Sequence, residues 1–76
     1  MNNLSDLNAG EFCKIIRLNI KGNIKRRLQD IGLIEGTTVK CELISPLGDP
    51  KAYRIRGALI AIRNSDAKYI DIEKTN

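Results

Sequence analysis

The side chains that could carry chemistry in this chain are two cysteines and nine carboxylates, and the sequence contains no histidine. Histidine is the commonest general base, and it often activates a catalytic thiol or binds iron(II). The carboxylates are scattered over expected turns and outward strand positions, where water would solvate them. We therefore expect neither enzyme activity nor a bound cofactor.

The two cysteines, Cys13 and Cys41, stand far apart and form no CxxC pair. No third thiol lies at the spacing of a zinc site. The pair is typical of two small core side chains in a reducing compartment. Metal sensing by the two thiols is an alternative that requires them to meet across adjacent strands. We expect no metal site.

Basic residues give the chain a net charge of +4, which favours an anionic partner without selecting one. Lysine or arginine early in a helix opposes the helix dipole at a cost of ~0.3–1 kcal/mol each. A partner-binding face and a solvated face both fit this pattern. The basic residues form two groups, one of Lys25, Arg26 and Arg27 and one of Lys51, Arg54 and Arg56.

One short amphipathic helix is expected after Gly22. Ile24, Leu28 and Ile31 stand at i, i+4 and i+7, on one helix face. Asn23 is a suitable N-cap, and Gly32 is a suitable left-handed residue to end the helix. Arg27 is expected to fold inward against backbone carbonyls. The rest of the basic group would then face solvent.

Most other segments alternate between apolar and polar residues, as strands do. Glycine and proline divide them into five short strands, at residues 11–18, 37–45, 52–57, 58–63 and 69–73. Adjacent Ile15 and Ile16 indicate a bulge or a strand covered on both faces. We predict a mainly β fold, an SH3-like small five-stranded barrel with one short α-helix, filling residues 1–76 as a single domain. An OB-type barrel normally needs a longer chain.

A nucleic-acid-binding barrel is the alternative function. Small barrels that bind single strands stack bases on aromatic side chains. This chain has only Phe12, Tyr53 and Tyr69, and the alternation places Phe12 and Tyr53 on the core face together with Leu43. We therefore expect no nucleic acid partner.

The chain shows no secretion signal and no long apolar segment. The longest apolar run, Ala58 to Ile62, is far shorter than the ~20 residues that a membrane helix needs. We therefore expect a cytoplasmic protein. Any membrane association would be indirect, through a partner.

The chain contains the motifs "RRLQDIGLIEGTTV", "SPLGDP" and "RIRGALIAIR" in this order. This combination resembles the FeoA family of small cytoplasmic proteins in bacterial ferrous iron transport, and the resemblance covers almost the full length of the chain. It implies an SH3-like barrel and a partner, the membrane transporter FeoB with its cytoplasmic GTPase domain. It also implies a role as an adaptor or regulator.

Exposed basic residues and one apolar turn residue are the predicted partner contacts. Leu47 is included because the core poorly explains an apolar residue at the tip of a turn. The predicted contact residues are Lys25, Arg26, Leu47, Arg54 and Arg56.

Overall fold

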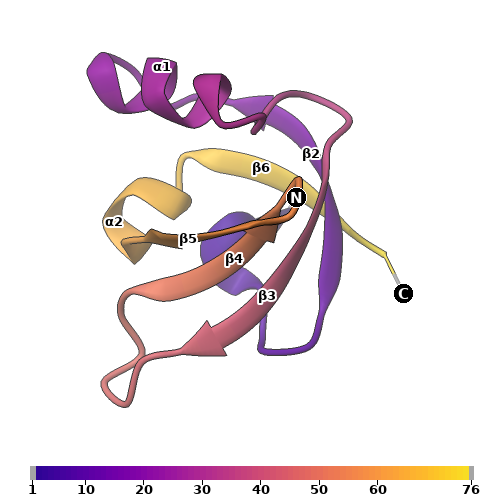
Figure 1. Ribbon diagram of the computed structural model, residues 1–76, viewed down its shortest axis with the longest axis vertical. Helices are drawn as coiled ribbons and strands as arrows, with labels where there is room; N and C mark the ends of the chain where they lie inside the picture. Colours follow the sequence, from indigo (N-terminus) through magenta and orange to yellow (C-terminus); the bar gives the residue numbers. More distant parts are fainter. Residues whose placement is uncertain (1, 76) are drawn as a thin grey trace.

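The computed structural model describes residues 2–75 and shows a strongly curved antiparallel sheet with short helices at its open side (Figure 1). The five predicted strands and the predicted helix are present. A two-residue strand, a 3₁₀ turn and a second helix are added to them. In chain order the elements are β1 (Asn2–Asn3), η1 (Leu4–Asp6), β2 (Phe12–Leu18), α1 (Asn23–Asp30), β3 (Thr38–Ile44), β4 (Lys51–Ile55), β5 (Ala58–Ile62), α2 (Asn64–Ala67) and β6 (Ile70–Thr75).

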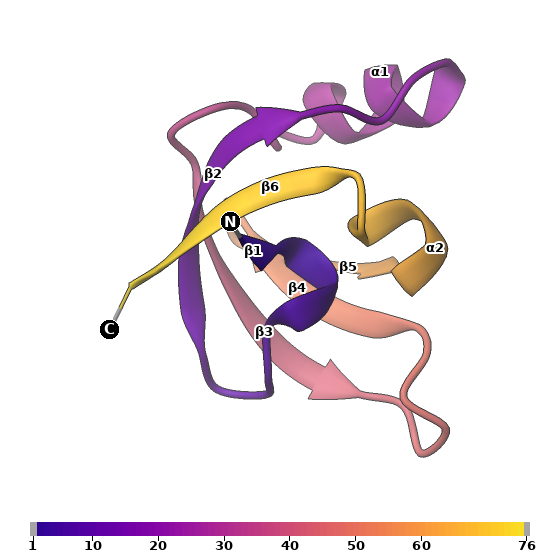
Figure 2. The same ribbon diagram turned by 180° about the vertical axis from the view of Figure 1, so that it is seen from behind.

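The strands form a single sheet in the order β1-β6-β2-β3-β4-β5. Neighbouring strands run antiparallel throughout the sheet. Seen from behind, β6 crosses beside β2, and the N-terminal segment lies against them (Figure 2). The curvature brings the sheet around one core, as the predicted small barrel requires, while β1 and β5 are its two edges.

A bulge in β2 explains its two adjacent isoleucines. The β2–β6 register shifts between Ile15 and Arg17. Ile15 is buried, while Ile16 is half-buried. The predicted irregularity is confirmed.

A second bulge, between Cys41 and Leu43 in the β3–β4 pairing, was not predicted. The extra residue turns Leu43 away from the core, because one added residue reverses the face on which later side chains lie. Leu43 is 61% exposed, so its predicted inward position was wrong. Ile44, the last residue of β3, is 37% exposed as well.

Helix α1 begins one residue earlier than predicted. Gly22, with φ of 78°, is the N-cap residue, and no side chain caps this end of the helix. The prediction of Asn23 as N-cap was wrong. At the other end, Leu33 N–H donates to Leu28 C=O at 2.9 Å and Gly32 N–H donates to Gln29 C=O at 3.0 Å. These two bonds form a Schellman motif, with Gly32 at C′ as expected.

Gly32 is held in a conformation that disfavours other residues, with φ of +101°. A Cβ built there would also clash with Cδ of Arg56. Gly32→Ala should therefore lower the free energy of unfolding by ~1–2 kcal/mol or more, measured by urea denaturation. The double variant Gly32→Ala/Arg56→Ala removes the contact but keeps the backbone strain, so it should recover only part of the loss. Full recovery would show that the backbone at Gly32 is unstrained.

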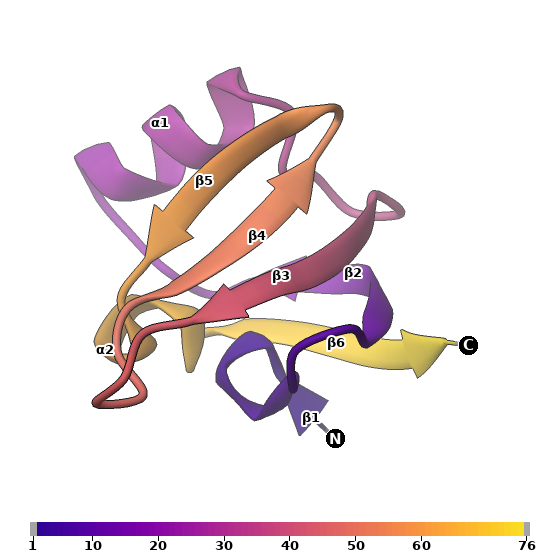
Figure 3. The ribbon, with the colours of Figure 1, turned by 60° about the horizontal axis from the view of Figure 1, so that its bottom comes forward.

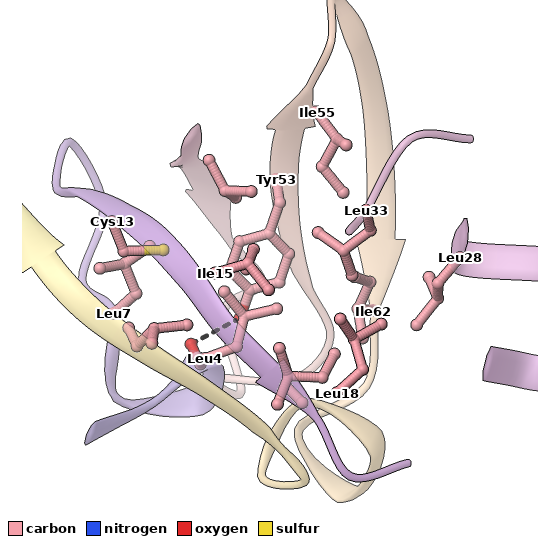
Figure 4. Packing of buried hydrophobic residues seen from close by; sticks show 14 of the residues in the cluster. Leu4, Leu7, Cys13, Ile15, Leu18, Leu28, Leu33, Tyr53, Ile55 and Ile62 are labelled. Carbon is pink, nitrogen blue, oxygen red and sulfur yellow. Dashed lines mark hydrogen bonds between the residues drawn. The ribbon is translucent and has the colours of Figure 1, made fainter. Parts of the chain in front are cut away.

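The core is built by alternate residues of β2 to β6, Leu28 and Leu33, and two leucines of the N-terminal segment (Figure 4). Leu4 and Leu7 are fully buried, although no strand prediction included them. Tyr53 is also fully buried, and its hydroxyl donates to Leu4 C=O at 3.2 Å. Phe12, predicted on the core face, is 41% exposed because Cys13 takes the inward position beside it.

The buried side chain of Lys51, on β4, connects the same N-terminal segment to the sheet. Its side chain is buried, and Nζ donates to the carbonyls of Ser5 at 2.6 Å and Leu7 at 3.0 Å. These carbonyls lie in and just after η1. Lys51 therefore has a structural role. Its position in the sequence grouped it with the exposed Arg54 and Arg56, but the side chain is buried.

Candidate protein-interaction surface

The five predicted contact residues fall into a basic part and an apolar part. Lys25 and Arg26 lie in the first half of α1, whose first turn contains no acidic residue. Arg26 is exposed, and Lys25 is half-buried. Two positive charges near the positive end of a helix dipole are mutually unfavourable. An anionic partner at this end of α1 would relieve that repulsion.

Arg54 lies on the outward face of β4 and is partly occupied by contacts within the sheet. Its Nε donates to Glu42 Oε2 at 3.1 Å, and Nη1 donates to the carbonyl of Gly57 at 3.2 Å. Lys40 Nζ lies 3.4 Å from the other oxygen of Glu42. The hydrogen bond from Arg54 holds the pKa of Glu42 below its usual value. Arg54 therefore presents a fixed positive group.

Arg56 forms the β4–β5 turn together with Gly57. Both residues have positive φ, 48° for Arg56 and 86° for Gly57, and Ile55 pairs with Ala58 across the turn. This is the two-residue hairpin geometry of a type I′ turn. The aliphatic part of Arg56 lies against Gly32. The turn therefore brings Arg56 to the C-terminal end of α1.

Leu47 lies at the other end of β4, in the β3–β4 loop, and is 96% exposed. The loop is held by hydrogen bonds, since Asn64 donates from its side chain to Gly48 C=O at 2.9 Å and from its backbone to Asp49 Oδ1 at 2.8 Å. The exposed Leu43 and Ile44 lie at the base of the loop. The sequence predicted the apolar tip but placed Leu43 in the core, because the β3 bulge has no clear sequence signal.

Leu47 and Arg56 are separated by the full length of β4, roughly 17 Å at 3.4 Å per residue. The predicted set is therefore not one continuous patch. Figure 3 shows the β3–β4 loop beside α2 and the β4–β5 turn at the opposite end of the hairpin. A partner that contacts both must extend along the β4–β5 hairpin.

Arg27 was predicted to fold inward, and this was wrong. Its side chain is exposed and lines a groove of about 300 Å³ between α1 and β5. The apolar walls of the groove come from both elements, and Arg63 and Asp66 line the end near α2. The groove adds a concave surface beside the predicted basic residues.

The two cysteines are free thiols buried in the core, on the adjacent strands β2 and β3. Burial raises the pKa of Cys13 to about 11 and also raises the pKa of Cys41. A soft metal binds the thiolate, which these environments disfavour at neutral pH. Residues 2–75 contain no group of three or more potential metal ligands. The arrangement favours a packing role for both cysteines.

Stability should fall at alkaline pH because burial raises the pKa of the Cys13 thiol. Above pH 9 the unfolded chain loses the Cys13 proton, while the folded chain keeps it until about pH 11. The unfolded state then binds fewer protons, so the free energy of unfolding decreases between these values. Burial also raises the pKa of Tyr53, which extends the decrease to higher pH. Urea denaturation between pH 8 and 11 measures it. Cys13→Ala should give a shallower decrease, and parallel profiles for the two proteins would contradict this assignment.

The exposed aromatic residues bear on the nucleic acid alternative. Phe12 and Tyr69 are both partly exposed, and each has a lysine over its ring, Lys40 at 5.5 Å and Lys68 at 5.3 Å. Phe12 begins β2, whereas Tyr69 C=O accepts a hydrogen bond from Asn19, just beyond the end of β2. A strand length of roughly 20 Å thus separates them. They do not form one stacking platform.

No helix among residues 2–75 combines the length and the apolar character that crossing a membrane would require.

Known proteins match the chain over nearly its whole length. The sequence model of the FeoA domain family matches residues 2–74. A curated Fe(2+) transport protein A/Fe(2+) transporter FeoB fusion protein from Porphyromonas gingivalis is 33% identical over 70 residues, which are 92% of this chain. The chain spans only 8% of the length of that fusion protein.

Solved structures agree with the fold. The FeoA protein from Chlorobium tepidum superposes with a TM-score of 0.93 and 31% identity, over 99% of this chain and 71% of that one. The zinc complex of Stenotrophomonas maltophilia FeoA, described as an SH3 domain protein, gives a TM-score of 0.84 at 23% identity, over 96% and 91% of the two chains. These likenesses confirm the predicted SH3-like fold. Because the family model covers almost all of its residues, this chain belongs to the FeoA domain family.

Proposed function

We propose that this protein is a non-enzymatic, cytoplasmic adaptor in bacterial ferrous iron uptake that binds the cytoplasmic GTPase part of the FeoB transporter. Membership of the FeoA domain family supports the link to ferrous iron transport. The absence of histidine from the sequence supports a binding role over catalysis.

The observation that carries the proposal is the relative from Porphyromonas gingivalis, in which Fe(2+) transport protein A and the transporter FeoB are one polypeptide. Fusion keeps two domains at a high effective concentration, in the millimolar range for short flexible linkers. Such a fusion is an advantage when the two domains act together. The same two parts on separate chains must then recognise each other through a surface.

The proposed contact residues are Lys25, Arg26, Leu47, Arg54 and Arg56. Their exposure and charge suit a surface that combines an apolar anchor with electrostatic steering. Leu47 is a suitable anchor because its loop is held by Asn64 and its side chain is 96% exposed. The basic residues would steer and orient the partner.

Reversing two charges tests this surface. Arg54→Glu/Arg56→Glu should weaken binding to the FeoB GTPase domain by about tenfold or more, which is roughly 1.4 kcal/mol. Both side chains are exposed, so the fold should persist. Isothermal titration calorimetry measures the affinity, and circular dichroism checks the fold.

A matched control is Lys14→Glu/Arg17→Glu on β2. It changes the charge equally and also places acids opposite acids, here Glu73 and Asp71. Binding by this control should stay close to that of the unmodified protein. Equal loss in both variants would show that only net charge matters and would contradict the proposed surface.

A further inference from the structure

The edge strand β5 has no protection of the usual kind. The opposite edge of the sheet, β1, is only two residues long. β5 has five residues, Ala58–Ile62, and all of them are apolar. Natural proteins usually protect such an edge with lysine, proline or a bulge, because it can pair with another chain. None of these devices occurs within β5.

The β4–β5 turn determines which backbone groups of β5 are free. In a two-residue hairpin, the residues that flank the turn form a hydrogen-bonded pair, and the pairs then alternate. Here Ile55 pairs with Ala58. Ala58, Ile60 and Ile62 therefore bond to β4, and the N–H and C=O groups of Leu59 and Ala61 point away from it. Outside the strand ladders, the backbone hydrogen bonds among residues 2–75 involve neither residue.

The groove between α1 and β5 lies along this strand. α1 contributes Ile24 and Leu28, its C-cap residue Ile31 adds to them, and β5 contributes Ile60, Ala61 and Ile62. In Figure 3, β5 is the outer strand of the curled sheet and α1 lies behind it. An added strand would find backbone partners on β5 and an apolar wall on α1.

The charges around the groove favour an added strand with acidic side chains. Arg27 and Arg63 line it, and Arg56 lies at the β4–β5 turn. The ion pairs among residues 2–75 use Lys40, Arg54 and Lys74. The three arginines beside β5 therefore take part in none of them. Asp66 is the one acidic residue among those that line the groove in the described part of the chain.

We propose that β5 accepts an extended segment of a partner protein as an additional strand, and that this segment alternates acidic and apolar side chains. The inference rests on the proposed adaptor function and specifies the chemistry of its partner. Backbone hydrogen bonds to Leu59 and Ala61 give affinity, as in other cases of strand addition. Apolar side chains enter the groove, and alternation places the carboxylates on the other face of the added strand. There they meet the arginines at the two ends of β5, Arg56 at the β4–β5 turn and Arg63 near α2.

Ala61→Pro is the decisive variant. Proline removes the outward N–H of Ala61 and fills the space beside it, while the bonds of β5 to β4 stay intact. Ala61→Val is the matched control, because it adds similar bulk and keeps the N–H. Circular dichroism and the dispersion of the amide NMR spectrum confirm that both variants fold.

Two probes are used with each protein. The first is the complete FeoB transporter from the same organism, reconstituted in lipid nanodiscs. The second is a blocked heptapeptide that alternates valine and glutamate, with a valine–lysine peptide as its charge control. The proposal expects Ala61→Pro to weaken binding to both the transporter and the valine–glutamate peptide at least tenfold, and Ala61→Val to bind within about threefold of the unmodified protein. It also expects amide shifts at Leu59 and Ala61 on adding the valine–glutamate peptide, and at least tenfold weaker binding of the valine–lysine peptide.

The outcomes separate the two proposals. If Ala61→Pro binds the transporter as well as the unmodified protein does, strand addition is overturned and the adaptor function stands. If the unmodified protein does not bind the transporter, the adaptor function fails and the peptide decides whether β5 accepts acidic strands. A concentration-dependent dimer that Ala61→Pro abolishes, without any peptide binding, would assign the edge to self-association and overturn the proposal. Equal binding of the two peptides would overturn its charge component.

Discussion

Replacing Leu28 with alanine should lower the free energy of unfolding by about 2–5 kcal/mol. Leu28 is the one residue of α1 that is buried, with 3% of its surface exposed. Its backbone carbonyl also accepts the bond from Leu33 that ends the helix. An eight-residue helix is too short to be stable alone. The packing of this side chain therefore decides whether α1 stays on the sheet.

Urea denaturation followed by circular dichroism measures the effect. Gln29→Ala, at the next, exposed position of the same helix, is the control and should change stability by less than about 0.5 kcal/mol. A domain of this size has few kilocalories to lose, so Leu28→Ala should also unfold at a clearly lower temperature. A loss below about 1 kcal/mol would mean that α1 is not anchored through Leu28.

Lys51→Met should cost about 2–4 kcal/mol, although methionine retains most of the side-chain volume. The substitution removes the ammonium group that bonds to the carbonyls of Ser5 and Leu7. A buried acceptor that loses its partner costs ~1–3 kcal/mol, and bonds to charged donors are the stronger ones. The desolvation of the ammonium group, which the variant avoids, offsets part of this cost.

Native-state hydrogen exchange distinguishes a local effect from a general one. In Lys51→Met, the amides of η1 and β1 should lose protection first, because Lys51 attaches this segment to β4. Lys74→Met removes an exposed lysine and is the control. If both variants have the same stability and protection, the Lys51 contacts do not hold the N-terminal segment.

The strands and the helix could be predicted because alternation and helical periodicity report burial directly. Tyr53, Ile55, Ile70 and Ile72 lie inward as their alternation indicates. The bulge after Cys41 could not be predicted, because it depends on how β3 meets β4. It accounts for the wrong placement of Leu43. Phe12 was placed wrongly because its neighbour Cys13 is equally compatible with the core.

The candidate surface was only partly predictable. Leu47 could be recognised as exposed because prolines on both sides prevent a strand there. Lys51 could not be recognised as buried, because its partners are carbonyls from a segment more than 40 residues away, which sequence patterns do not report. The edge position of β5 could not be predicted either, because an apolar run has the same sequence pattern in a central strand and in an edge strand.

Binding of this protein to the cytoplasmic GTPase part of FeoB can be measured by NMR titration. The isotope-labelled protein is titrated with the purified GTPase domain of FeoB from the same organism. We predict saturable amide shifts on α1, on the β4–β5 hairpin and on the β3–β4 loop, and none with a mixed-sequence oligonucleotide at low salt. No shifts with the GTPase domain at millimolar concentration, or shifts only with the oligonucleotide, would contradict the proposed binding.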